Sequence, residues 1–160
     1  MKYDIKIAVA ISASCLIGNL HAKDAPFPES FRGLSLTESV YACLVYFHNA
    51  VNFELSALQM QPNNTSFQKA LRSLVRMKTS VLAISSDDIP EERRQIAEGM
   101  LGLKVEEESR EMMNYCVAVS NTAEEKMGQK IRGWVDEHVE EELRRQLRSV
   151  GSRSWRKPPR

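Results

Sequence analysis

The stretch SLTESVYACLVYFHNAVNFELSAL, residues 35–58, decides the fold because it carries one continuous apolar stripe. Ser35 and Glu38 have the spacing of a capping box, which predicts that a helix begins here. The breaker cluster at 61–64, Gln-Pro-Asn-Asn, predicts its end. The apolar residues recur every three or four positions: Leu36, Val40, Cys43, Phe47, Val51, Leu55 and Leu58. This spacing predicts one long amphipathic helix with Cys43 facing the core.

A second helix is predicted to follow the breaker cluster, with Thr65 or Ser66 as its cap and residues 85–88 as its end. Its apolar side consists of Phe67, Ala70, Leu71, Leu74, Val75, Val81 and Leu82. Its basic residues form a ridge on another face: Lys69, Arg72 and Arg76. The pattern is again that of an amphipathic helix with one apolar side.

Two further segments have helical periodicity. Pro90 starts the first, with acidic residues in its first turn, and the pattern continues to Ser120 through Gly99 and Gly102. The last segment is expected to begin at 121–122, where Thr122 and Glu125 have capping-box spacing, and to end near 151. Its apolar side consists of Met127, Ile131, Trp134, Val135, Val139, Leu143 and Leu147.

No segment shows strand alternation or hairpin dipeptides, so the predicted fold is all-α. We expect a small antiparallel bundle of four to five helices over residues 35–150, preceded by an extended leader at 23–34. A basic tail at 151–160, expected to be disordered, completes the chain. Residues 1–22 are interpreted separately, because they do not resemble part of a folded domain.

Residues 1–22 have the order of a secretory signal peptide: a basic start, a short apolar run and a small residue, Ala22, at the expected cleavage site. The sequence therefore predicts an exported protein, periplasmic or secreted, with no transmembrane span, because no later run reaches about 20 apolar residues. Cys15 within this segment suggests lipid attachment as the alternative. The preceding Ser12 stands where a lipoprotein signal has leucine, and this favours plain cleavage.

Cys43 and Cys116 are the two cysteines that remain after cleavage, and in an oxidising compartment we expect them to form one disulfide. Two buried free thiols are the alternative. In a straight four-helix bundle Cys116 would lie about 40 Å along its helix, at the end remote from Cys43. A bridge needs Cα atoms within about 7 Å, so a chain reversal at 99–102, and hence five helices, is favoured. Crossed helix packing would also bring the cysteines together.

Charge and motifs exclude several functions. The chain has 22 basic and 21 acidic residues, of which two and one lie in the signal, so 20 of each remain. This balance argues against a general nucleic-acid binder. The sequence has no phosphate-binding glycine loop, nucleophile elbow or metalloprotease motif, and it suggests no cofactor. His138 with Glu142 provides too few ligands for a metal site, and we expect His138 on a solvated face and His48 as a partly buried packing residue.

Two other clusters each have a plain structural interpretation. The carboxylates at 106–108 point in different directions on a helix, so a solvated face is expected rather than acid–base catalysis. Four methionines, Met100, Met112, Met113 and Met127, suggest either a client-binding groove or ordinary core residues, and we favour core.

The basic tail is the least neutral feature of the chain. The candidate partner-binding residues are Arg153, Trp155, Arg156 and Lys157. They suit an acidic groove on a protein or an anionic surface, whereas the alternative is a solubilising tail.

The expected function is therefore non-enzymatic binding of a protein partner. In architecture alone, the chain is similar to periplasmic inhibitor and immunity proteins that neutralise cell-wall-degrading toxins. That resemblance implies an immunity or inhibitor protein. The alternative is a periplasmic assembly factor or chaperone that binds client proteins, and a homodimer is left open.

Overall fold

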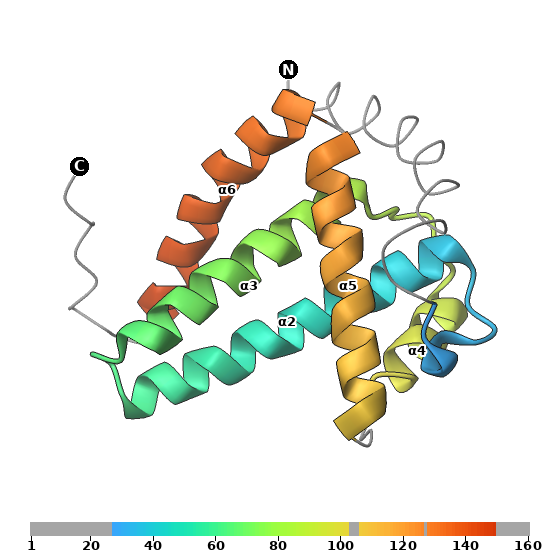
Figure 1. Ribbon diagram of the computed structural model, residues 1–160, viewed down its shortest axis with the longest axis horizontal. Helices are drawn as coiled ribbons and strands as arrows, with labels where there is room; N and C mark the ends of the chain where they lie inside the picture. The colour runs from blue at the N-terminus through green and yellow to red at the C-terminus, as the bar shows by residue number, and fades with distance from the viewer. Residues whose placement is uncertain (1–26, 103–105, 127, 150–160) are drawn as a thin grey trace.

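The computed structural model describes residues 27–102, 106–126 and 128–149, and every regular element within these ranges is helical. The predicted signal peptide, with Cys15, and the tail residues Arg153, Trp155, Arg156 and Lys157 lie outside the described residues. The elements are a short 3₁₀ helix η1 (Glu29–Phe31) and five α-helices: α2 (Leu36–Met60), α3 (Thr65–Ile84), α4 (Glu91–Gly99), α5 (Glu106–Lys126) and α6 (Gly128–Ser149). The all-α prediction is confirmed (Figure 1).

Helix α2 begins and packs as its sequence predicts. The capping box is complete: the Ser35 amide donates to Glu38 Oε2 at 2.7 Å, and the Glu38 amide donates to Ser35 Oγ at 3.3 Å. The predicted stripe is buried at Val40, Cys43, Phe47, Val51, Leu55 and Leu58, and Leu36 packs half-buried against it. Burial of each such side chain contributes roughly 1.5–3 kcal/mol, so this stripe anchors α2 in the core.

Helix α3 is capped one residue earlier than expected. Asn64, rather than Thr65 or Ser66, is the N-cap, and its Oδ1 accepts hydrogen bonds from the amides of Ser66 and Phe67 at 3.0 and 3.3 Å. Asparagine caps at least as well as serine or threonine, and at this position its side chain satisfies two first-turn amides. The predicted end holds, because the helix stops at Ile84.

The chain ends one helix at the paired glycines and begins another, as the disulfide argument requires. Helix α4 ends at Gly99, α5 begins at Glu106, and Cys43 is bonded to Cys116 with a Cα–Cα distance of 5.2 Å. Figure 1 shows that α5 also crosses α2 steeply instead of running along it. The reversal and the crossed packing therefore both bring the cysteines together.

The expected start of the last helix at residues 121–122 is wrong. Helix α5 continues to Lys126, and the Thr122 hydroxyl donates to the Ala118 carbonyl at 2.8 Å instead of capping a new helix. Threonine inside a helix commonly bonds the carbonyl four residues back, so capping-box spacing alone is ambiguous. The change of direction occurs at Gly128, whose φ of 64° is accessible to glycine without a Cβ clash.

The core lies around α3, which packs against α2, α5 and α6 and is seen between α2 and α6 in Figure 1. The segment before α2 also contributes to it. Phe31 of η1 is fully buried, and the rings of Phe27, Phe31 and Tyr115 meet edge to face at centroid distances of 5.4–6.2 Å. None of the described helices combines the length and the apolar character needed to cross a membrane.

Candidate protein-binding surface

Helix α2 carries a second apolar row besides the one in the core. It continues the line set by the buried residues Ser39 and Cys43, and successive positions along this line are alternately four and three residues apart. We call its later part the outer stripe: Tyr46, Ala50, Phe53, Ala57 and Met60. Phe53 and Met60 are 74% and 78% exposed, whereas Tyr46 is half-buried against the core. Such large exposed apolar side chains on a regular helix mark the stripe as a candidate interface.

The crossing of α5 explains why the stripe is uncovered. Where the row begins, α5 packs on it: Cys43 is bonded to Cys116, and the Ser39 hydroxyl lies 3.1 Å from the Tyr115 hydroxyl. A helix that crosses steeply covers only a short part of its neighbour, and in Figure 1 the later turns of α2 extend beyond α5. The disulfide holds this crossing point, so the rest of the row stays open along α2.

The part of α2 that bears the outer stripe is almost free of charge. Between Ser39 and Met60 the only aspartate, glutamate, lysine or arginine is Glu54. The exposed polar side chains beside the stripe are neutral amides and hydroxyls, together with one imidazole: His48, Asn49, Asn52, Ser56 and Gln59. His48 is exposed and hydrogen-bonds Asn52 at 3.2 Å, so the expectation that it is partly buried is wrong. Depletion of charge with exposed aromatic and methionine side chains is typical of the centre of a protein interface.

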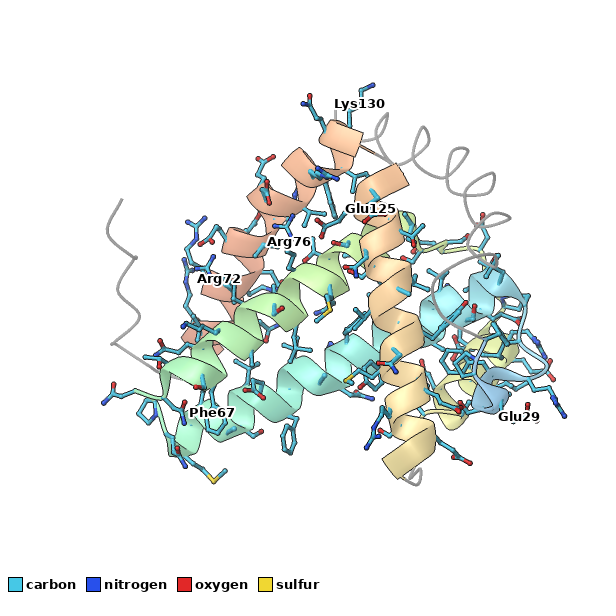
Figure 2. All side chains as sticks on the ribbon, in the orientation of Figure 1. Glu29, Phe67, Arg72, Arg76, Glu125 and Lys130 are labelled. Carbon is cyan, nitrogen blue, oxygen red and sulfur yellow. A yellow bond between two sulfur atoms is a disulfide. The ribbon has the colours of Figure 1, made fainter. Side chains whose placement is uncertain are left out.

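The opposite side of the bundle is a charged seam between α3, α5 and α6. From the predicted basic ridge of α3, Arg72 pairs with Glu140 in the acidic run of α6. Lys78, which was not part of that prediction, pairs with Glu142 of the same run at 3.1 Å. Figure 2 shows Arg72 and Arg76 on the side of α3 toward α6. The acidic run is therefore partly a helix-pairing surface and not only a solvated face.

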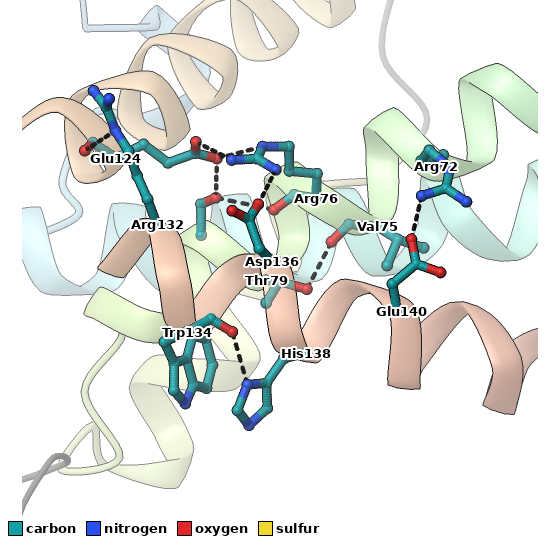
Figure 3. Close-up of polar contacts among 11 residues, drawn as sticks. Arg72, Val75, Arg76, Thr79, Glu124, Arg132, Trp134, Asp136, His138 and Glu140 are labelled. Carbon is teal, nitrogen blue, oxygen red and sulfur yellow. Dashed lines mark hydrogen bonds and ion pairs between the residues drawn. The ribbon is translucent and has the colours of Figure 1, made fainter. Parts of the chain in front are cut away.

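Arg76 is at the centre of this seam (Figure 3). It donates to both carboxylate oxygens of Glu124 on α5, at 2.7 and 3.1 Å, and to Asp136 on α6 at 2.6 Å. The Ser80 hydroxyl also donates to Glu124, at 2.6 Å. The hydrogen bonds to Glu124, and then the one to Asp136, raise the pKa of Arg76. A bidentate arginine–carboxylate pair with a second acid links three helices in one arrangement.

Glu142 is the most enclosed acid of the acidic run. Burial tends to raise its pKa, but hydrogen bonds from Gln146, Lys78 and Arg145 outweigh burial, and the pKa is lowered. Its carboxylate therefore already binds two cations and an amide.

His138, the other residue of the metal pair considered from sequence, stacks on Trp134 at a ring-centroid distance of 4.0 Å. Its Nδ1 lies 2.8 Å from the Trp134 carbonyl oxygen, to which it is hydrogen-bonded. No group of three metal-ligating side chains occurs among the described residues.

An ion pair outside the seam joins the start of α2 to α4. Arg93 of α4 donates to both oxygens of Glu38, at 2.6 and 2.7 Å, and to the Gly33 carbonyl at 3.0 Å. The Arg93 hydrogen bonds lower the pKa of Glu38 to about 2, despite the opposing effect of burial. Nearby, burial and then a 2.6 Å hydrogen bond to Glu98 raise the pKa of Tyr41 to about 12. These groups join α2 to α4 and form no open site.

The candidate residues from sequence are dispersed in the structure. Met112 is 3% exposed and belongs to the core, whereas its neighbour Met113 is 43% exposed, so the methionines do not form one groove. Met127, the side chains at 106–107 and the tail residues lie outside what the structure describes. Sequence reasoning missed Phe53 and Met60. The sequence pattern that could have identified them is a second row of apolar residues along 46–60, in a helix with almost no charged residues.

No protein-family model, curated protein or solved structure matches this chain. The choice of a candidate site therefore depends on geometry alone. On that basis the outer stripe is favoured over the charged seam, because the seam's arginines and carboxylates already bind each other across the helices.

Proposed function

We propose that this chain is a non-enzymatic, exported binding protein, and specifically a periplasmic immunity or inhibitor protein that neutralises a secreted toxin by binding it. The observation that supports a binding function is the outer stripe, where Phe53 and Met60 are exposed on a helix with almost no charge. Large aromatic side chains in such positions are the usual anchors of protein interfaces. The toxin is the partner class implied by the architectural resemblance.

The disulfide supports the proposal in two ways. A bonded Cys43–Cys116 pair is expected of proteins in oxidising compartments, which agrees with an export signal. It also holds α5 across the first turns of α2, so the outer stripe is presented on a helix that is already ordered. A surface that is ordered before binding loses less conformational entropy on association.

The test is co-purification from periplasmic extract of the producing bacterium, followed by mass spectrometry and an activity assay of the captured partner. We expect one stoichiometric partner, inhibited by the bound protein. Phe53→Glu is expected to abolish capture, because it places a charge at the centre of an apolar interface. The matched control is Leu82→Glu on α3, since Leu82 is also exposed (47%) and apolar. Equal capture by both variants, or capture without inhibition, would contradict the proposal.

The alternative function is that of an assembly factor or chaperone for periplasmic clients. Exposed methionines, Met60 on α2 and Met113 on α5, favour it because flexible thioethers adapt to many partners. The same co-purification separates the two functions. Many substoichiometric clients, lost together in Phe53→Glu, would support the chaperone and contradict the inhibitor.

The tail proposal has its own test. If Arg153, Trp155, Arg156 and Lys157 dock on an acidic partner, removal of residues 151–160 should slow association, and binding should weaken as salt rises. Binding that is unchanged by both would assign the interface to the helical body alone.

A further inference from the structure

We infer that, in the free protein, the outer stripe is covered by a second copy of this chain, packed antiparallel on it about a two-fold axis near Phe53. This inference rests on the proposed function, because it concerns the same surface. A toxin or client that binds the stripe would then displace the second copy. Self-association is thus the resting state of the surface that later meets a partner.

The stripe is complementary to itself in an antiparallel pair. Phe53 is its midpoint, with one alanine and one large side chain on either side. A two-fold axis next to Phe53 places Ala50 opposite Ala57 of the other copy, and Tyr46 opposite Met60 of the other copy. The alanine pairs allow close approach of the two backbones, and a thioether against a tyrosine ring is a favourable contact. The same patch serves both copies, as an isologous interface requires.

Charge also favours a second copy as the occupant. When identical faces meet, every charge on the face meets its like, so a charged face opposes its own pairing. Residues 39–60 of α2 carry one charged residue, Glu54, whereas α6, of similar length, carries ten. Self-pairing through α2 therefore has almost no electrostatic cost. Glu54 is the exception. The two-fold axis places the Glu54 residues of the two copies on the same side of the helix pair, where their like charges repel.

The dimensions of the stripe set the expected strength. From Tyr46 to Met60 the helix advances about 21 Å at 1.5 Å per residue, about four turns. Two helices in contact over this length bury less than the roughly 800 Å² per partner of a standard interface. We therefore expect a reversible dimer with a Kd on the order of micromolar, weak enough for a tighter partner to displace.

The first test is sedimentation equilibrium of the purified, oxidised protein over a wide concentration range, with circular dichroism to verify folding. We expect a monomer–dimer equilibrium that Phe53→Glu weakens about tenfold or more, while Leu82→Glu leaves it unchanged. Glu54→Gln and added salt should both tighten the dimer, because each reduces the like-charge repulsion. A monomer at every concentration, or a dimer insensitive to Phe53→Glu, would overturn the inference.

The second test fixes the orientation. Ala50→Cys and Ala57→Cys are prepared separately, mixed and mildly oxidised with the native disulfide intact. The mixture should give a covalent dimer, because residue 50 faces residue 57 of the other copy. Each variant alone should not, since its two thiols lie about 10 Å apart along the axis, beyond disulfide reach. Cross-linking of either variant alone, or of neither sample, would refute the antiparallel pair.

The two proposals fail separately. A protein that stays monomeric but captures one partner through Phe53 would refute the self-association and leave the proposed function standing. If Phe53→Glu breaks the dimer but leaves capture of a toxin unaffected, self-association stands. The proposal that a toxin binds through the outer stripe is then refuted.

Discussion

Helices α2 and α6 lie on either side of α3 and have similar lengths, 25 and 22 residues, yet they present opposite surfaces. Helix α6 has ten charged residues, and several of them pair with α3. Helix α2 has two, Glu38 and Glu54, and on its later turns, which extend beyond α5 in Figure 1, Phe53 and Met60 of the outer stripe are 74% and 78% exposed. The comparison indicates that the charged residues of α6 serve to pair it with other helices of the same chain. The outer face of α2 is instead suited to binding another molecule.

The energies of the two surfaces differ as well. An exposed ion pair contributes about 0.2–1 kcal/mol, but a bidentate arginine shared by two acids is worth more and is costly to break. The outer stripe contributes little to folding, because its two largest exposed side chains remain in water. Substitutions in the seam should therefore affect stability, and substitutions in the stripe should affect association.

The largest expected effect comes from the disulfide, which determines how much of α2 is covered. Replacement of both Cys43 and Cys116 by alanine should lower the free energy of unfolding by about 4 kcal/mol, because a long closed loop is released in the unfolded chain. Urea unfolding of the variant and the wild type measures this difference. An unchanged midpoint would mean that α5 is held across α2 by packing alone.

The seam should be the next most sensitive region. Arg76→Met removes the cation that joins Glu124 and Asp136, leaving the less exposed Glu124 with the Ser80 hydroxyl, and should cost about 2 kcal/mol. Arg148→Met, at an exposed position of α6, is the control and should stay within about 0.5 kcal/mol. Equal losses in chemical unfolding would contradict a special role for Arg76.

Acid should weaken the ion pair between Glu38 and Arg93 at the start of α2. The pKa of Glu38 is about 2 in the folded protein, below its ordinary value of 4.5. The stabilisation is therefore fully present above pH 4.5 and is lost as the pH falls toward 2. We expect a loss of about 1–2 kcal/mol, after allowance for solvent screening of the half-buried Arg93. Glu38→Gln should flatten this part of the pH–stability curve, and an unaltered curve would contradict the assignment.

The smallest expected effect on stability is that of Phe53→Glu. Because the ring is 74% exposed, the free energy of unfolding should change by no more than about 0.5 kcal/mol. Thermal unfolding at low concentration, where the protein is monomeric, measures this. A large loss would mean that Phe53 supports the fold, and the loss of association in this variant would then have to be interpreted as misfolding.

Local patterns were sufficient for much of the fold. The capping box at Ser35 and the core row of α2 are confirmed, because both depend on residues within a few turns of one helix. The pairing of Cys43 with Cys116 was predicted from the two cysteines that would remain after cleavage of the expected signal peptide. The five-helix layout was predicted from the short Cα–Cα distance that a disulfide allows. The break at 99–102 was predicted from this distance requirement together with the two glycines at 99 and 102.

Some sequence patterns are compatible with two different local structures, and for these the prediction was wrong. Thr122 and Glu125 have capping-box spacing, but Thr122 bonds Ala118 inside α5 and the chain turns at Gly128. Thr65 and Ser66 are the predicted caps of α3, but Asn64 is the residue that caps it. In both cases the spacing suits more than one assignment, and the hydrogen bonds that the side chains make show which one holds.

The sequence by itself determined the helical class, the buried face of α2 and the covalent link to α5, because periodicity and cysteine count are local or combinatorial properties. Only the tertiary structure decided that α5 crosses α2, that the acids of α6 meet the arginines of α3, and that the outer stripe stays open. The physical reason is that a helical sequence shows which faces are apolar or charged. Which of those faces another helix covers depends on the crossing angles and on where the chain reverses.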